Sequence, residues 1–260
     1  MASFIELKEL HDKFLEPKLL MDTYTGKDAP FVKDTVTRVI PLLSKAFSSG
    51  CMEGEMLVAL CFGPFFQWAF PACEYFTDII ICSPNDKCLT ELEKWRLNEP
   101  GAIDWSHAAK AFCELQGKGE SWIEKQTMWQ KKIKQCFIYD LSTSNPLSPT
   151  VLPQADCLLL SHCLEAHVTD KENYRTALEN ASTLLKKGGH LLMIACLEET
   201  FYMVGGFKFP HFSFDEGFVR KALDEGGYDI EELQVFPRRV THLYDVADYS
   251  GFIFVNAVKR

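Results

Sequence analysis

The sequence predicts one α/β domain, built on a mainly parallel β-sheet that carries helices on both faces. Three observations support this fold class. The chain has 260 residues, a length that suits a single domain. Short apolar runs alternate with longer segments of helical periodicity. Most of the short runs are apolar throughout, as expected of strands that are buried on both faces of a sheet.

The N-terminal part of the chain predicts helices. Residues 5–21 have the periodicity of an amphipathic helix, and residues 30–47 have apolar side chains at helical spacing. Gly50 and Gly54 bracket the end of the second helix. We therefore expect residues 1–50 to form a helical cap that precedes the sheet.

The pattern changes after Gly54. Residues 56–61 predict a first buried strand, Gly63 and Pro64 a turn, and residues 78–82 a second strand. A charged helix over residues 86–97 follows, and two helical segments between residues 100 and 132 interrupt the alternation as an insertion over the sheet.

The rest of the chain continues the alternation. A helix is expected to stop at Lys187-Gly188-Gly189, where basic residues favour the helix dipole and glycine supplies the cap. The Pro/Ser-rich stretch 146–153 is a loop, too short to separate domains. The expected strands are residues 136–139, 156–161, 190–195 and an added, antiparallel 251–257, and the expected helices are 171–186 and 214–226.

Composition excludes several classes of partner. The net charge is -9, which argues against binding to nucleic acid or to an anionic membrane. No apolar stretch reaches the ~20 residues of a spanning helix, and the N-terminus lacks a signal-peptide pattern, so we expect a cytoplasmic protein.

The 10 cysteines include no CxxC pair. They are typical of free thiols in a reducing compartment, and no metal site is predicted.

Ligands of parallel α/β sheets bind beyond the carboxyl ends of the strands, where the strand order reverses. Candidate site residues therefore follow each predicted strand. They lie at residues 61–66, 83–86, 140–141, 161–165 and 195–202.

A set of ordered motifs resembles the small-amine N-methyltransferases, the family of the nicotinamide, indolethylamine and phenylethanolamine enzymes. The first two of these branches are the most similar. The motifs extend over nearly the whole chain, and their common order makes the resemblance specific. They are LTELEKW at 89–95 with EPG at 99–101 and DW at 104–105, NPL at 145–147, LPQADC at 152–157, LLKKGGHL at 184–191, YMVG at 202–205 and GYDIE at 227–231.

The resemblance implies a Rossmann-like, class I methyltransferase fold, with a seven-stranded, mostly parallel sheet in one methyltransferase-like domain over residues 1–260. It implies transfer of a methyl group from S-adenosylmethionine to a small amine or pyridine, such as nicotinamide or an indolethylamine. Such enzymes act mainly by holding donor and acceptor close together. The resemblance also implies a monomer.

The family's cofactor positions are only partly matched. By resemblance, the cofactor-binding residues are Tyr24, Gly63, Ser83, Asp140, Leu141 and Ser161. Asp140 stands where the family's Asp accepts from the adenine amino group, and Leu141 stands beside it to pack on the ring. Asp140 is equally typical of a turn after a strand.

The turn after the first strand departs from the family's "LIDIGSGPT". Ala59, Cys61 and Phe62 replace the Asp, the first Gly and the Ser, while Gly63 and Pro64 match. A Cβ and a phenyl ring where the backbone must approach a ligand block that approach. We expect the Phe62 ring to fill the vacated space as core.

The ribose position also departs from the family. Ser83 replaces the acidic residue that takes both ribose hydroxyls, and Cys88 replaces an Asn. Asp86 could substitute for the missing carboxylate, but we favour it as the cap of the next helix.

On the acceptor side, Ala195 replaces an orienting Asp, so Glu199, Tyr24 and Tyr202 are the remaining candidates for an acceptor pocket. Adjacent glutamates such as Glu198 and Glu199 are more often solvated, and Tyr202 is equally explained by core packing. Glu165, flanked by His162 and His167, suggests acid–base chemistry, although isolated histidines are usually structural.

Two hypotheses follow. The replacements affect the methionine, ribose and acceptor ends together, and each lost polar contact costs about 1–3 kcal/mol. They favour a pseudo-methyltransferase with impaired or lost cofactor binding and a structural, ligand-binding or partner-binding role. The alternative is an active N-methyltransferase with a remodelled pocket. A changed chemistry at Cys61 or Cys82 is disfavoured, because apolar strands disfavour a thiolate.

Overall fold

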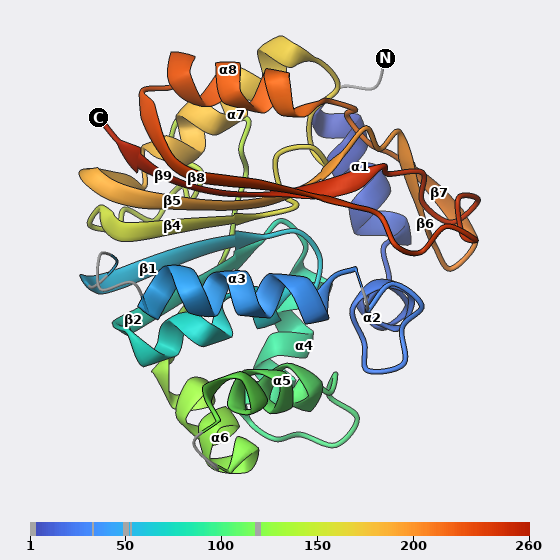
Figure 1. Ribbon diagram of the computed structural model, residues 1–260, viewed down its shortest axis with the longest axis vertical. Coiled ribbons are helices and arrows are strands. Elements are labelled where there is room, and N and C mark those ends of the chain that lie inside the picture. The colour runs from blue at the N-terminus through green and yellow to red at the C-terminus, as the bar shows by residue number, and fades with distance from the viewer. Residues whose placement is uncertain (1–3, 33, 49–51, 53, 118–120) are drawn as a thin grey trace.

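Seven strands form one sheet in the computed structural model, which describes residues 4–32, 34–48, 52, 54–117 and 121–260 (Figure 1). The strand order is β3-β2-β1-β4-β5-β9-β8, and the first five strands are parallel. β9 is antiparallel to both β5 and β8, as expected for the last strand. The strands are β1 Gly54–Cys61, β2 Phe76–Ser83, β3 Ile133–Ile138, β4 Ala155–Ser161, β5 Leu185–Leu197, β8 Tyr228–Pro237 and β9 Gly251–Lys259, and a separate hairpin consists of β6 Phe201–Val204 and β7 Phe207–Pro210.

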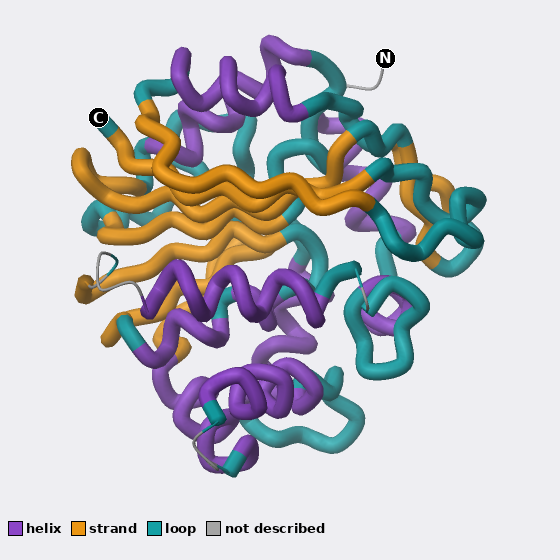
Figure 2. Tube along the Cα trace, viewed as in Figure 1, coloured by secondary structure: helices purple, strands orange, loops and turns teal. Residues whose placement is uncertain are grey.

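Helices cover both faces of the sheet (Figure 2). Alternate residues of β1 pack on opposite sides: Leu57 and Ala59 join the core beneath α2 to α6, whereas Val58 and Leu60 join the core beneath α7 and α8. The helices are α1 Phe4–Phe14, α2 Pro17–Tyr24, α3 Val36–Ser48, α4 Asp86–Arg96, α5 Ser106–Gln116, α6 Trp122–Lys132, α7 Lys171–Ser182 and α8 Glu216–Glu225, with two 3-10 turns at Phe66–Trp68 and Phe70–Glu74. The predicted three-layer α/β fold is confirmed.

The N-terminal helix predictions are wrong in their boundaries. The single helix expected at 5–21 is two helices, because Pro17 has no N–H to continue α1 and instead begins α2 at its first turn. The helix expected from residue 30 begins at Val36. Two helices, α5 and α6, are found between residues 100 and 132.

The end of the helix predicted at 171–186 is also wrong. α7 ends at Ser182, and β5 begins at Leu185, which pairs with Ala155 of β4. Gly188 lies within the strand at a φ of +73°, so its conformational freedom serves an irregular strand start rather than a helix cap.

The cap of α4 is a further correction. Asn85, not Asp86, accepts a hydrogen bond from the backbone N–H of Lys87 at 3.0 Å, and Asp86 is the first residue of the helix. Asp86 therefore lies in the first turn, where a negative side chain interacts favourably with the helix dipole.

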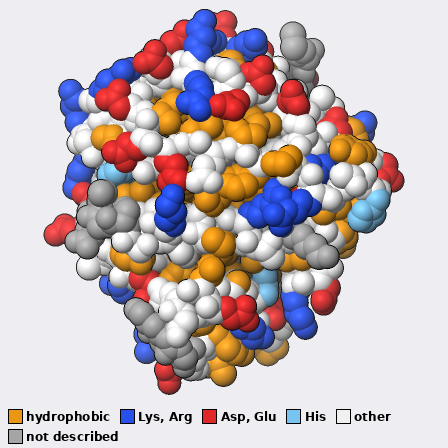
Figure 3. Space-filling view, in the orientation of Figure 1, with side chains coloured by type: hydrophobic (Ala, Val, Ile, Leu, Met, Phe, Trp, Pro, Cys, Tyr) orange, Lys and Arg blue, Asp and Glu red, His pale blue; other side chains and the backbone are white. Residues whose placement is uncertain are grey.

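The cysteines of the described residues are free thiols, most of them buried, as the sequence predicts; Cys51 lies outside these residues. Of the helices in the described part of the chain, none combines the length and apolar character needed to cross a membrane. On the face drawn in Figure 3, acidic and basic side chains are interspersed.

Candidate active site

The order of the parallel strands reverses between β1 and β4, which is where such sheets bind ligands. Cys61 and Ser161 end these two strands side by side, and Ser83 ends the neighbouring β2. α1, α2 and the β6–β7 hairpin lie at this carboxyl edge of the sheet (Figure 1). The N-terminal helices therefore lie against the strand ends at which the sequence predicts the ligand site.

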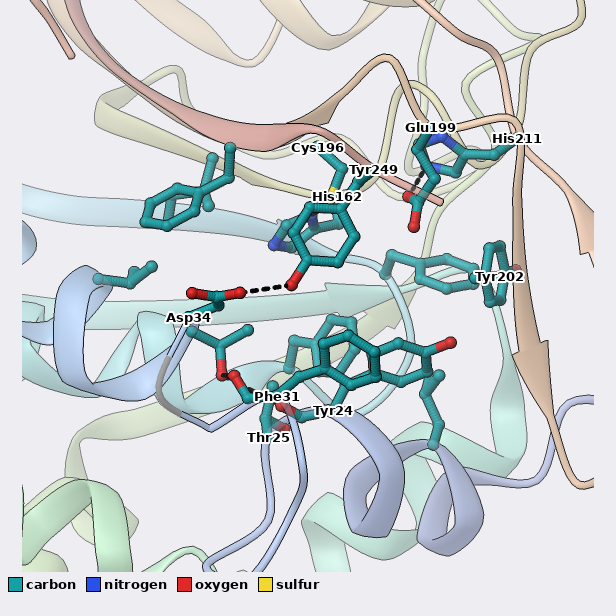
Figure 4. A pocket seen from close by; sticks show the side chains of 17 residues that line it. Tyr24, Thr25, Phe31, Asp34, His162, Cys196, Glu199, Tyr202, His211 and Tyr249 are labelled. Atoms are coloured by element: carbon teal, nitrogen blue, oxygen red, sulfur yellow. Dashed lines mark hydrogen bonds and ion pairs between the residues drawn. The ribbon is translucent and has the colours of Figure 1, made fainter. Parts of the chain in front are cut away.

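A cavity of about 70 Å³ lies at this edge, and it is mostly apolar. Tyr24, Glu199 and Tyr202, which the sequence nominates for an acceptor pocket, all line it (Figure 4). Other lining residues were not expected from the sequence, because they come from segments far apart in the chain. They include Phe31, Asp34, His211 and Tyr249, whereas Phe62, Phe65 and Cys196 lie in the ranges that the sequence nominates.

Glu199 is buried, contrary to the expectation that it is solvated, whereas Glu198 is exposed. Its Oε2 lies 3.3 Å from Nε2 of His211 (Figure 4). Burial raises the pKa of Glu199, with the nearby Glu165 and Asp248 adding to the effect, and lowers the pKa of His211 to about 3. The distance alone would suit an ion pair, but burial disfavours both charges, so the two side chains face each other as a neutral pair.

A second pair of buried groups adjoins the cavity. Glu165 Oε1 lies 3.7 Å from Nδ1 of His162, and the same nitrogen is 3.8 Å from Sγ of Cys196. Burial raises the pKa of Glu165 to about 8 and lowers the pKa of His162 to about 4. His162, Glu199 and His211 therefore line one small cavity, with Glu165 behind His162, and burial disfavours the charged form of all four groups.

Tyr24 is engaged by the backbone of the hairpin. Its hydroxyl accepts from Met203 N at 3.1 Å and has the carbonyls of Met203 and Val246 within donating distance, at 3.0 and 3.2 Å. The Tyr24 ring lines the cavity, while its hydroxyl orients α2 against β6.

The cofactor positions at the strand ends are buried. Ser83 and Ser161 are fully enclosed; the Ser83 hydroxyl accepts from Asn85 N at 3.5 Å, and the Ser161 hydroxyl has no partner among the described residues. Gly63 has a φ of +58°, and a Cβ there would collide with the Leu20 side chain of α2. The turn needs glycine for its conformation and for the close approach of α2.

The two residues expected to contact adenine, Asp140 and Leu141, differ in their exposure to solvent. Asp140 is exposed, and its carboxylate accepts from the backbone N–H and the hydroxyl of Ser142 at 2.9 and 2.6 Å, as a turn residue does. Leu141 is buried in the core beneath α7. Both line a second cavity of about 50 Å³, together with Tyr139 and His167.

Phe62 lies between the two cavities. Its ring centroid is 5.2 Å from that of His11, 5.7 Å from that of His167 and 5.6 Å from that of Tyr202. It is 4% exposed, so it fills space at the carboxyl end of β1, as the sequence predicts. His11 was not expected here, because nothing in a helical pattern shows which buried residue faces a distant strand.

No group of three or more His, Cys, Asp or Glu in the described ranges is arranged to hold a metal ion.

Comparison with known proteins places the chain in a family. A sequence model of the NNMT/PNMT/TEMT family matches residues 2–260. The indolethylamine N-methyltransferase of Oryctolagus cuniculus is 34% identical over 97% of this chain and 95% of its own length. The nicotinamide N-methyltransferase of Sus scrofa is 35% identical over 90% of each chain, and the phenylethanolamine N-methyltransferase of Homo sapiens is 34% identical over 84% of this chain and 78% of its own.

Solved structures support the same fold. The magnesium protoporphyrin IX methyltransferase of Synechocystis PCC 6803 with bound SAH superimposes with a TM-score of 0.60 at 12% identity, covering 98% of this chain and 100% of that one. The N-methyltransferase NodS of Bradyrhizobium japonicum WM9, in complex with S-adenosyl-L-homocysteine, has a TM-score of 0.54 at 12% identity, covering 99% of each chain. The fold is thus that of a class I S-adenosylmethionine-dependent methyltransferase, and the chain belongs to the NNMT/PNMT/TEMT family.

Proposed function

We propose that this chain is a pseudo-methyltransferase, which keeps the family scaffold and a small ligand pocket but has impaired or lost binding of S-adenosylmethionine. The observation that carries the proposal is the ring of Phe62, which occupies the carboxyl end of β1 against His11 and His167. In this fold class the backbone of that turn approaches the ligand. A phenyl ring in that position takes the room that the methionine part of the donor needs.

The sizes of the cavities support the proposal. Pockets that bind small molecules the size of S-adenosylmethionine have volumes of roughly 300–1,000 Å³. The two cavities on either side of Phe62 measure about 70 and 50 Å³. Neither has room for a nucleoside joined to an amino acid.

The polar groups support it as well. Ser83 ends β2 with a short, buried hydroxyl instead of a carboxylate, and Asp140 directs its carboxylate into its own turn. Ribose hydroxyls and an adenine amino group would lose charge-assisted partners here, at about 1–3 kcal/mol each.

A thermal-shift titration tests the proposal. We expect the melting temperature to stay constant up to millimolar S-adenosylmethionine or S-adenosylhomocysteine. A ligand at 100 times its dissociation constant would add about 2.7 kcal/mol of stability. The nicotinamide N-methyltransferase of Homo sapiens serves as the positive control. A saturable shift for this chain, confirmed by calorimetry, would overturn the proposal.

The second candidate is an active N-methyltransferase that acts on a small amine or pyridine. The observation in its favour is the 70 Å³ cavity, which keeps the aromatic walls Tyr24 and Tyr202 and a buried carboxyl group at Glu199. Mass spectrometry of nicotinamide or tryptamine incubated with S-adenosylmethionine and the protein separates the two candidates. We expect no methylated product, and turnover would favour the second candidate.

The remaining expectations belong to the same proposal. We infer a cytoplasmic monomer, organised as one methyltransferase-like domain with residues 1–50 as its cap and residues 100–132 as a helical insertion. If the protein is active, its partner is a small amine or pyridine acceptor, and we expect no binding to nucleic acid or to a membrane.

A further inference from the structure

A wall of four rings separates the two cavities at the carboxyl ends of β1 and β4. It consists of His11, Phe62, His167 and Tyr202. The centroid of the His11 ring is 5.4 Å from that of His167 and 5.2 Å from that of Phe62. Phe62 and Tyr202 line the 70 Å³ cavity, and His167 lines the 50 Å³ cavity. Movement of one ring of this wall would therefore connect the two cavities.

His11 differs from the other three rings because it belongs to α1. Of the α1 side chains whose burial the structure describes, Leu7 and His11 are buried, and they lie one turn apart. The helix ends at Phe14, and the backbone is not helical at Leu15 and Glu16. Leu15 is fully buried and can act as a pivot. Elements with few buried side chains open at low free energy.

The principal polar contact that holds α1 in place is a hydrogen bond between His11 Nε2 and the hydroxyl of Tyr202, at 2.7 Å and buried. The other ring nitrogen of His11 is buried without a partner among the described residues, which opposes the closed position. Asn85 adds two long hydrogen bonds to α1, at 3.4 Å. The ion pair between Lys87 and Glu16 is exposed and contributes little.

We propose that α1 is a hinged lid, held closed by the hydrogen bond between His11 and Tyr202, and that its opening joins the two cavities into one groove along the ends of β1 and β4. Rotation about Leu15 and Glu16 withdraws the His11 ring, while Phe62 and His167 remain on the sheet side. The open groove admits a ligand larger than either cavity accepts. The lid controls access to the site and operates whether or not a methyl donor binds.

Hydrogen exchange of the full-length protein, without ligand, tests the lid. In Tyr202→Phe the ring remains but the hydroxyl is lost, so we expect exchange of the α1 amides to accelerate about fivefold to tenfold, while β1 and β4 keep their protection. The matched control is Tyr228→Phe, which removes another buried hydroxyl that hydrogen-bonds Ser182 at 2.8 Å. This control should leave α1 exchange unchanged.

A second readout follows a buried thiol close to Tyr202. Cys88 is fully buried at the start of α4, and opening of the lid should expose its thiol to iodoacetamide. We expect Cys88 to be alkylated several times faster in Tyr202→Phe and in His11→Leu than in the wild type. Unchanged α1 exchange in both variants would overturn the proposal. So would an equal acceleration in α1, β1 and β4, because it would mean global unfolding.

Discussion

The Phe62 ring is 4% exposed and directly follows the carboxyl end of β1. The replaced turn motif predicts a ring that fills space, and the ring is buried against His11, His167 and Tyr202. This could be predicted because an aromatic side chain that directly follows a buried strand cannot avoid the strand end. The partners of the ring could not be predicted, because α1 and β6 are far from it in sequence.

Truncation of Phe62 measures how much of the fold depends on it. We expect Phe62→Ala to lower the free energy of unfolding by about 3 kcal/mol, because a buried ring is replaced by a cavity. Urea denaturation provides the measurement. Phe207→Ala is the control, because Phe207 is 46% exposed, and it should cost less than about 1 kcal/mol. A loss below 1 kcal/mol for Phe62→Ala would mean that its ring faces an open groove.

Glu199 shows where reasoning about single residues fails. Two adjacent glutamates are usually solvated, but Glu198 adopts a φ of +54° and directs its neighbour inward. The backbone turn after β5 therefore decides which of the two side chains is buried. The sequence offers no signal for this, because the turn depends on contacts such as Glu198 N with the carbonyl of Phe214.

At the scale of elements, the strands that can be predicted are those with short, uniformly apolar sequences. β1, β2 and β4 are found where the sequence places them, because each is buried on both faces. Helix ends are less predictable. α7 stops at Ser182 because Leu185 is needed to pair with Ala155, and that pairing is a long-range contact.

Asp34 fixes the segment before α3 to the connection between β8 and β9. Its carboxylate accepts from the backbone N–H groups of Arg239 and Val240 at 2.9 and 3.0 Å and from the Tyr249 hydroxyl at 3.0 Å. We expect Asp34→Ala to lower the free energy of unfolding by about 3–5 kcal/mol, because several buried donors lose their acceptor.

Urea denaturation again gives the measurement for Asp34. Asp28→Ala, in the same segment but exposed, should change stability by less than about 0.5 kcal/mol. A similar, small effect of both substitutions would mean that the connection is held by packing rather than by the carboxylate.

At the scale of the whole molecule, the family scaffold is readable from the sequence, whereas the cavity is not. The ordered motifs from Leu89 to Glu231 predict the sheet and its helices, and the fold confirms them. The cavity is built by side chains from α2, from the ends of β1 and β5 and from the hairpin. Its shape depends on how these segments meet, which no local pattern records.

The buried histidines make stability depend on pH. Burial lowers the pKa of His162 and His167 to about 4 and of His211 to about 3, and it lowers the pKa of His11 as well. Below pH 6.5, the ordinary pKa of histidine, the unfolded chain binds protons that the native state does not. These groups therefore destabilise the fold as the pH falls.

The buried carboxyl groups act in the opposite direction. Burial raises the pKa of Glu165 to about 8 and also raises the pKa of Glu199. Above pH 4.5, the ordinary pKa of glutamate, the native state keeps protons that the unfolded chain releases. Their contribution to stability is complete at low pH and is lost as the pH rises towards 8.

Together these groups predict a stability maximum near pH 6.5. Between pH 4.5 and 6.5 the four histidines outnumber the two carboxyl groups, so we expect stability to rise with pH. Above pH 6.5 the histidine effect ends, and the carboxyl groups lower stability towards pH 8. Urea denaturation at pH 5, 6.5 and 8 measures both slopes. Glu199→Gln should reduce the loss of stability at alkaline pH and leave the histidine contribution in place, whereas a flat profile in the wild type would mean that water reaches these groups.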